Sequence, residues 1–268
     1  MLYFHEKWEY LIITIRKKNK TEDINMFFIK EQKNNKPIKA FTLAETLITL
    51  VVVGIVAAIT VPMISMQHQK EETITRIKKV YSVLQQTTFR AIADYGQPTT
   101  WTTLSTDNWN ASKDFAERYL LPYMSVSYKC EDNTEPKCNY EIHNLNNTDF
   151  EMPSNTYRFY LQDGTFIFLH TKHESSTELS GRIFFDINGP KKPNKFGRDV
   201  FKIEYWIQSS HESRKVQLGK ITPAWSNLDR ATIMGTGESE YCHKSKKGHS
   251  CLGVIVKDGW KISDDYPW

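Results

Sequence analysis

The sequence predicts an α+β fold, in which a long N-terminal helix packs on an antiparallel β-sheet. Three observations support this prediction. No charged side chain occurs in residues 47–64, and the run is largely apolar. A single apolar stripe at helical spacing follows it, among Lys, Glu, Arg and Gln residues. From Thr156 onwards, runs of aromatic and β-branched residues alternate with turn signals, which is typical of antiparallel strands.

The long helix is expected to run from Phe41 to about Ala93 and to end at Gly96-Gln-Pro98. Its first half is apolar on all sides, and a run of about 20 such residues can cross a bilayer. Its second half is amphipathic, so the rest of the chain must cover one face of it. Because Pro62 lacks a backbone donor, we expect a kink or a locally melted turn there.

The sheet is expected to contain four strands, which begin at Tyr157, Thr165, Arg182 and Val200. Asp163-Gly164 is a hairpin signal between the first two of them. One face of this sheet would pack on the amphipathic half of the helix.

Three further elements are expected outside these strands. A short helix is predicted around residues 112–121, and residues 208–240 are predicted to be loop because Ser, Gly and Thr cluster there. A final strand is predicted after Cys251, in Leu-Gly-Val-Ile-Val.

Glu45 is the only ionisable side chain in residues 40–64. A charge at the bilayer centre costs about 2.5 to 3.5 kcal/mol, and less near the end of a span. A carboxylate just inside an apolar run therefore indicates a function and requires a cationic partner.

The residues around Glu45 carry a family resemblance. Lys39-Ala40-Phe41-Thr42-Leu43-Ala44-Glu45, followed by the apolar run, resembles the cleavage and methylation motif of type IV pilins and type II secretion pseudopilins. In that family a prepilin peptidase cuts just before the Phe, and the new amino terminus is N-methylated. The resemblance places the cut between Ala40 and Phe41. Since the family usually has Gly where Ala40 stands, we expect slower processing.

The proposed cut would create a charged amine close to Glu45. An amine at Phe41 would lie one helical turn from the carboxylate. Packed subunits could then pair the amine of one chain with the Glu45 carboxylate of its neighbour.

The resemblance implies a pilin-like arrangement and four parts of the chain. These are a cytoplasmic leader that is removed (1–40), a transmembrane and assembly helix (41–64), an amphipathic helix (65–96) and an extracytoplasmic globular domain (97–268). Met26 opens a second, self-sufficient basic leader, so both Met1 and Met26 are candidate starts.

The resemblance also implies a function. The protein would be a structural subunit of a type IV pilus or a type II secretion pseudopilus, not an enzyme, with Phe41, Glu45 and Pro62 as assembly residues. Its partners would be prepilin peptidase, the inner-membrane assembly machinery, the membrane and other pilin or pseudopilin subunits. It would cross the bacterial inner membrane once, with its globular domain outside the cytoplasm, in the periplasm or at the cell surface.

Other interpretations of the apolar run stay open. It could be a plain signal anchor, or a secretory signal peptide cut after Val56-Ala57-Ala58. The protein would then be a membrane-anchored or secreted monomeric binding domain. The sequence contains no Gly-rich phosphate loop, no Gly-x-Ser-x-Gly elbow and no His-Glu-x-x-His motif, so no enzyme class is indicated.

The basic excess of the chain lies in its first 40 residues. They hold nine of the 35 Lys and Arg and five of the 31 Asp and Glu, so residues 41–268 hold 26 of each sign. A basic leader before a neutral remainder is what the positive-inside rule favours. No nucleic-acid partner is therefore expected.

The four cysteines form two local pairs, Cys130 with Cys138 and Cys242 with Cys251. Beyond a translocated helix the compartment is oxidising, which favours disulfides. Each bond would close a loop of roughly ten residues and stabilise the fold by about 2.5 kcal/mol. His243 and His249 beside the second pair also suggest zinc, but adjacent Cys and His ligands fit a tetrahedral site poorly, and the disulfide is favoured.

One loop could hold a cation. Asp186, Asn188 and Asp199 are oxygen donors, and Ca²⁺ takes six to eight oxygens. The segment loosely resembles a loop of pseudopilin-like proteins, some of which bind calcium in the sheet domain. Because four Lys and Arg residues stand beside only two carboxylates, an ordinary Asn-Gly/Pro turn is favoured over a calcium site, and no other cofactor is expected.

Overall fold

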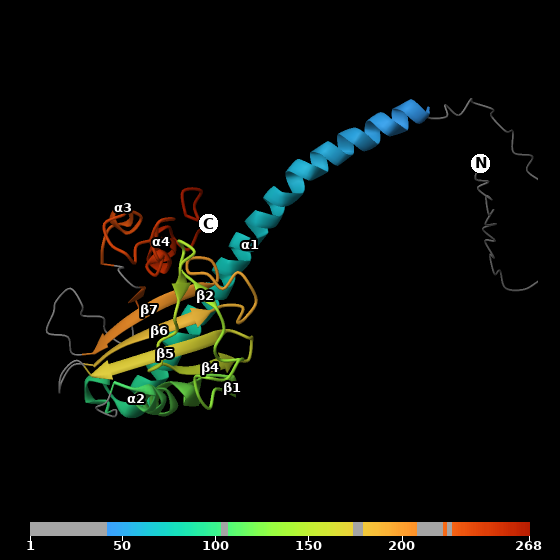
Figure 1. The fold of residues 1–268 in the computed structure, drawn as a ribbon. Coiled ribbons are helices and arrows are strands. Elements are labelled where there is room, and N and C mark those ends of the chain that lie inside the picture. Colours follow the sequence, from blue (N-terminus) through green and yellow to red (C-terminus); the bar gives the residue numbers. More distant parts are fainter. Residues whose placement is uncertain (1–41, 103–106, 174–178, 208–221, 224–226) are drawn as a thin grey trace, which may run out of the picture. The chain divides into compact units, whose positions relative to one another are not determined.

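The computed structural model describes residues 42–102, 107–173, 179–207, 222–223 and 227–268 (Figure 1). The chain divides into two compact units, residues 1–53 and residues 54–268. The long helix α1, Leu43–Tyr95, contributes its first turns to one unit and the remainder to the other.

The described part of the first unit is the beginning of α1. Thr42 precedes the helix, and the backbone N–H of Thr46 donates to the carbonyl of Thr42 at 3.2 Å. Every side chain from Thr42 to Val53 is exposed.

In the second unit α1 continues without interruption to Tyr95. The helix passes through Pro62 without a break, so a locally melted turn, one of the two expected effects of Pro62, does not occur. It ends as predicted at Gly96, whose φ of +78° favours a residue without a side chain.

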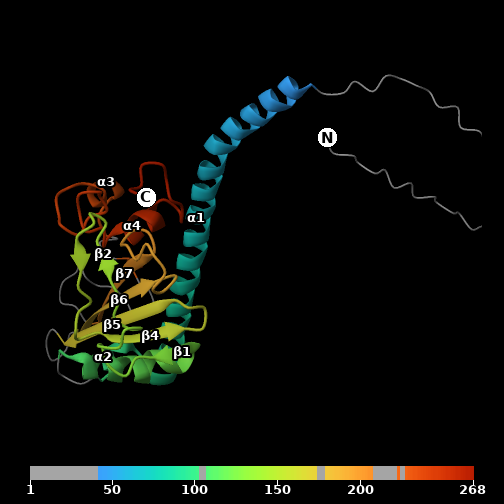
Figure 2. The ribbon, with the colours of Figure 1, turned by 45° about the vertical axis from the view of Figure 1, so that its right-hand side comes forward.

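The amphipathic stripe of α1 is buried, as predicted. Its buried positions are Thr73, Ile74, Ile77, Val80, Leu84, Thr87, Thr88 and Ala91. They repeat at intervals of three and four residues, which places them along one side of the helix. Figure 2 shows these turns of α1 beside the sheet.

The main sheet has six strands, all antiparallel to their neighbours, in the order β1-β4-β5-β6-β7-β8. The four predicted strands are its centre, and the sequence missed only the short edge strands. The strands are β1 Val126–Lys129, β4 Tyr157–Leu161, β5 Phe166–His173, β6 Leu179–Asp186, β7 Val200–Ile207 and β8 Thr222–Pro223. A separate two-stranded sheet pairs β2, Ile142–His143, with β3, Asp149–Phe150.

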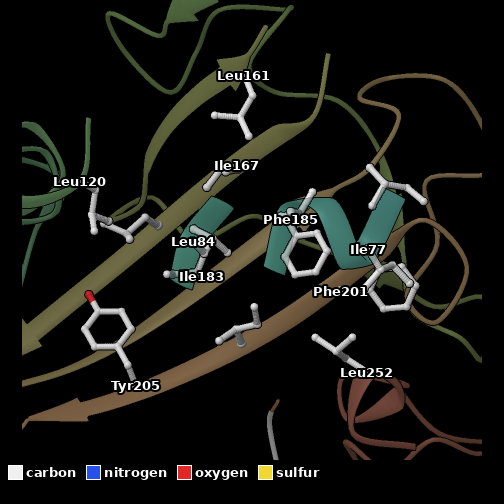
Figure 3. Close-up of a cluster of buried hydrophobic side chains, with 14 of the residues drawn as sticks. Ile77, Leu84, Leu120, Leu161, Ile167, Ile183, Phe185, Phe201, Tyr205 and Leu252 are labelled. Carbon is white, nitrogen blue, oxygen red and sulfur yellow. The ribbon is translucent and has the colours of Figure 1, made fainter. Parts of the chain in front are cut away.

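The sheet is covered on both faces. On one face, Ile77 and Leu84 of α1 lie among Ile183, Phe185 and Phe201 of the sheet (Figure 3). On the other face, a second cluster joins strand aromatics to the small sheet and the first disulfide loop. Its buried members are Cys130, Cys138, Ile142, Tyr160, Phe166, Phe168, Phe184, Phe196 and Val200. Because both faces are buried, the Phe166–Leu169 part of β5 and the Ile183–Phe185 part of β6 are continuous apolar runs. In β7, by contrast, Lys202 and Glu204 alternate with apolar residues.

Several short helices complete the fold. Pro98–Thr100 forms a 3₁₀ turn after α1. The helix expected near 112–121 is α2, Trp109–Phe115, which continues as a π-helical turn and a 3₁₀ turn to Tyr123. The C-terminal part contains α3, Arg230–Ile233, and α4, Cys251–Lys257.

Two predictions for the C-terminal part are wrong. The segment expected to be a strand is the helix α4. The buried residues of this segment include Cys251, Leu252, Val254 and Ile255. Side chains at these spacings fall on one side of a helix, whereas a strand would divide them between its two faces. Of the loop expected at 208–240, the described portion contains β8 and α3, and residues 208–221 and 224–226 lie outside the described residues.

Candidate functional site

The first turn of α1 holds Glu45 by reciprocal hydrogen bonds with Thr42. The Glu45 backbone N–H donates to Thr42 Oγ1 at 3.2 Å. In return, the backbone N–H and hydroxyl of Thr42 donate to Glu45 Oε2 at 2.8 and 3.0 Å. This is a capping box, which satisfies free backbone donors at a helix start. It engages one carboxylate oxygen of Glu45.

The charge of Glu45 is not balanced within the described part of the chain. No Lys or Arg there lies within ion-pair distance of its carboxylate. Ala40 and Phe41, the predicted processing residues, lie outside the described residues, so the predicted amine is not placed.

The helix that follows exposes apolar side chains in every direction. All large apolar side chains from Leu43 to Met66 are exposed, with Leu43 at 78% and Ile64 at 68% of full exposure. The helix contains an 18-residue window with a mean hydropathy of 2.7, none of it buried. By length and composition α1 can therefore cross a membrane.

The threonines within this apolar stretch keep their polar atoms occupied. The hydroxyls of Thr46, Thr49 and Thr60 donate to backbone carbonyls three or four residues earlier, at 2.8 to 2.9 Å. A polar group in hydrocarbon is costly unless it is paired internally. These hydrogen bonds adapt the stretch to an apolar environment.

The structure joins the cysteines in the expected local pairs, Cys130 with Cys138 and Cys242 with Cys251. Cys242 and Cys251 are thus not thiolate ligands. His249 instead lies 2.9 Å from Asn144 Oδ1 and 3.5 Å from Glu240 Oε1.

Arg158 organises the first disulfide loop, and sequence reasoning missed it. This side chain on β4 is buried, and its guanidinium donates to the carbonyls of Cys138 at 2.9 Å, Pro153 at 3.2 Å and Met152 at 3.3 Å. Burial lowers its pKa to about 10. The sequence signal that could have identified Arg158 is its position as a charged residue within an aromatic strand.

The structure brings Asp186, Asn188 and Asp199 together in the loop between β6 and β7. Asp186 is buried, and it accepts from Asn188 N at 3.1 Å and from the hydroxyl of Tyr140 at 3.0 Å. Burial and the nearby Asp199 raise the pKa of Asp186 to about 8. Asp199 is also buried, which raises the pKa of its carboxyl.

The oxygen donors of this loop, on Asp186, Asn188 and Asp199, fit a bound cation only in part. Asp199 accepts from the backbone N–H of Asn194 at 2.8 Å and of Lys195 at 2.6 Å, so the loop is already a hydrogen-bonded turn. However, the buried Oδ1 atoms of Asn188 and Asn194 have no hydrogen-bond partner. Over the described ranges, no three His, Cys, Asp or Glu residues are grouped to hold a metal. The side chains of Asp186, Asn188, Asn194 and Asp199 carry six oxygens, but both oxygens of Asp199 already accept from backbone N–H groups. Because Ca²⁺ takes six to eight oxygens, carbonyls or waters would have to complete the set.

Comparison with known proteins adds two matches. Residues 35–61 match the prokaryotic N-terminal methylation motif, which confirms the predicted resemblance to type IV pilins and pseudopilins and marks a protein that prepilin peptidase processes. Residues 63–268 match a family of unknown function (DUF6613). Because this match covers most of the chain, the protein belongs to that family. No curated protein and no solved structure matches it significantly.

Proposed function

We propose that this protein is a filament subunit of a type IV pilus or a type II secretion pseudopilus. In this proposal it is cut before Phe41 and polymerises through the first half of α1. The observation that carries the proposal is Glu45, a carboxylate at the start of a fully exposed apolar helix. No described cation of its own chain neutralises it.

The exposed helix requires a covering. Apolar area in water costs about 25 cal/mol per Å², and this stretch contains 14 exposed large apolar side chains from Leu43 to Met66. Lipid covers them before assembly, and other subunits cover them afterwards. Pro62 leaves the carbonyl of Ala58 without its intrahelical donor, and in this proposal it remains one of the assembly residues.

The charge of Glu45 requires a partner. N-methyl-Phe41 of a neighbouring subunit would supply a cation at the same depth in the membrane. Such a pair forms only between subunits in one register, so it selects the stagger of the filament. The partners of the protein would be prepilin peptidase, the inner-membrane assembly machinery and other pilin-like subunits. The globular part would lie outside the cytoplasm.

Glu45→Gln separates this role from helix capping. Gln also completes a capping box, so the substitution keeps the helix start and removes only the charge. Loss of a charged hydrogen bond worth about 1.5 to 3 kcal/mol lowers assembly roughly tenfold or more. Filament recovered by shearing should fall accordingly, while membrane-inserted subunit stays constant.

Glu71→Gln is the matched control, because Glu71 is an exposed carboxylate beyond the apolar run. It should assemble like the parent protein. Normal filament yield from Glu45→Gln would instead favour the other function class, a monomeric binding domain tethered to the membrane.

A second proposal concerns calcium in the β6–β7 loop. It is supported by the unpartnered Oδ1 atoms of Asn188 and Asn194 beside the buried Asp186 and Asp199. A bound ion would stabilise the folded state in proportion to the logarithm of its concentration. The thermal midpoint of the full chain should rise in calcium over chelator, and Asn188→Ala should reduce the rise. Equal thermal midpoints in calcium and in chelator would show that the β6–β7 loop is an ordinary turn that binds no calcium.

A further inference from the structure

A groove of about 670 Å³ lies between α1 and the β6–β7 loop, entirely within the second unit. Both views show this loop, in orange, beside α1 (Figures 1 and 2). Four basic side chains line the groove, and they are Arg76, Lys191, Lys192 and Arg198.

Only one of these cations is paired with a carboxylate. Arg76 lies 2.8 Å from Glu72 and also donates to the carbonyl of Ile187. Lys191, Lys192 and Arg198 form no ion pair with any carboxylate among the described residues. The guanidinium of Arg198 instead lies 5.1 Å from the centre of the Trp268 ring.

The acidic residues of the groove are Glu72, Asp163 and Asp199, and Glu72 is paired with Arg76. Asp163 pairs with Lys79 at 2.8 Å. Asp199 accepts from backbone N–H groups and is buried. The outer wall of the groove therefore carries a surplus of positive charge, on the exposed Lys191 and Lys192 and the half-buried Arg198.

The position of the groove along α1 relates this charge to a membrane surface. No Asp, Glu, Lys or Arg occurs in the 24 residues from Thr46 to Gln69, which span about 36 Å as a helix. The hydrocarbon core is about 30 Å thick, with roughly 5 to 8 Å of headgroups on each side. Gln69, the first α1 residue of the groove, thus lies at about headgroup depth.

The rest of the groove remains within electrostatic reach of that surface. From Gln69 to Arg76 the helix rises by about 10 Å, which is the Debye length at about 0.1 M salt. The long Lys191 and Lys192 side chains can extend towards the phosphates. Trp268 adds a half-buried indole, a group that favours the membrane interface.

We propose that this groove binds the phosphate groups of anionic phospholipids in the membrane that α1 crosses. The ammonium groups of Lys191 and Lys192 and the guanidinium of Arg198 donate to the phosphate oxygens, which are charge-assisted hydrogen bonds. This proposal rests on the membrane insertion in the proposed function, and it does not require polymerisation. Headgroup binding holds the globular part at the membrane surface before the subunit enters a filament.

Lysine acetylation in nanodiscs tests the proposal with the full chain. The protein is placed in nanodiscs of phosphatidylcholine alone, or of phosphatidylcholine with about a third phosphatidylglycerol. A short pulse of an acetylating reagent is followed by mass spectrometry. Lys191 and Lys192 should be modified about fivefold more slowly in the anionic discs, since each basic residue near such a surface gains about 1 kcal/mol. Lys129, an exposed residue of β1, should react equally in both.

Two controls identify the source of the protection. High salt should remove it, because exposed charges are screened. Inorganic phosphate added to phosphatidylcholine discs should leave Lys191 and Lys192 reactive. Protection by phosphate alone would overturn the membrane assignment in favour of a soluble anion.

A pair of variants tests the same point by lipid retention. Native mass spectrometry of the full chain in detergent counts retained phosphatidylglycerol. Lys191→Gln/Lys192→Gln should lose these adducts, whereas Lys244→Gln/Lys246→Gln, with the same change of charge outside the groove, should retain them. Equal acetylation in both discs, or equal retention by both variants, would overturn the proposal. Failure of the protein to co-elute with nanodiscs would contradict membrane insertion itself.

Discussion

Lys202 on β7 is buried, and its Nζ lies 2.6 Å from Oε2 of Glu240 in the C-terminal part. Glu204 Oε1 is 3.0 Å from the same nitrogen. This pair connects the central sheet to the residues directly before the loop that the Cys242–Cys251 disulfide closes. A buried charge that loses its partner is strongly destabilising, whereas replacement of both partners by apolar groups is often neutral.

Glu240→Ala should lower the free energy of unfolding by about 3 kcal/mol, at the low end of the range for a broken buried pair because Glu204 still faces Lys202. Chemical denaturation of the full chain in detergent measures the change. Lys202→Met/Glu240→Leu is the control and should recover most of the loss. A single variant as stable as the parent protein would show that the pair is not coupled to folding.

Replacement of Arg158 should be almost as costly. Arg158→Lys cannot reach the carbonyls of Cys138, Met152 and Pro153 together, so buried acceptors lose their donor. Each such group costs about 1 to 3 kcal/mol, so we expect a loss of about 2 to 4 kcal/mol. Arg118→Lys, at an exposed pair with Asp114, should change stability by less than about 1 kcal/mol. Equal effects of the two substitutions would contradict the role assigned to Arg158.

Acid should destabilise the C-terminal part in two steps. Burial lowers the pKa of His249 from 6.5, against the opposing hydrogen bond with Glu240. The unfolded chain therefore binds more protons below about pH 6.5, and stability falls as the pH drops through that range.

The second step belongs to Glu240. Burial alone would raise the pKa of its carboxyl, but the hydrogen bond with His249 and the charge of Lys202 outweigh burial and hold the pKa well below 4.5. Its contribution is complete above pH 4.5 and is lost as the pH falls towards the lower folded value. Thermal midpoints between pH 7 and about pH 2 follow both steps, and His249→Gln should flatten the upper one. An unchanged slope in that variant would assign the pH dependence to other groups.

Processing should leave N-methyl-Phe41 as the first residue of the protein isolated from its native membrane. Intact mass and amino-terminal sequencing test this directly. Ala40→Gly should raise the processed fraction, because the peptidase usually meets Gly at this position. Ala58→Leu removes the small residue directly before the alternative signal-peptide cut and should change nothing. A protein that begins at Ile59 would instead support a secreted form, and an uncut chain would support a plain anchor.

Much of the architecture could be predicted because it depends on local patterns. The uncharged run and the stripe from Ile74 to Ala91 follow the helical period, and Gly96 provides the positive φ that ends α1. The central strands were also predictable, since β-branched and aromatic runs were separated by turn signals such as Asp163-Gly164. The C-terminal helix was not, because Val254 and Ile255 have strand propensity and only their burial beside the Cys242–Cys251 bond selects a helix.

The sequence by itself determined that a carboxylate stands at the start of an apolar, membrane-length helix, since charge and periodicity are properties of consecutive residues. Only the tertiary structure decided which distant side chains meet. Arg158 reaches carbonyls on two separate loops, and Lys202 reaches Glu240, 38 residues away. The sequence shows that Arg158 is a charged residue in an aromatic strand, but it does not show which distant groups these side chains meet, because that depends on how the sheet, its covering loops and α1 pack together. The same packing places Lys191 and Arg198 in one groove with α1.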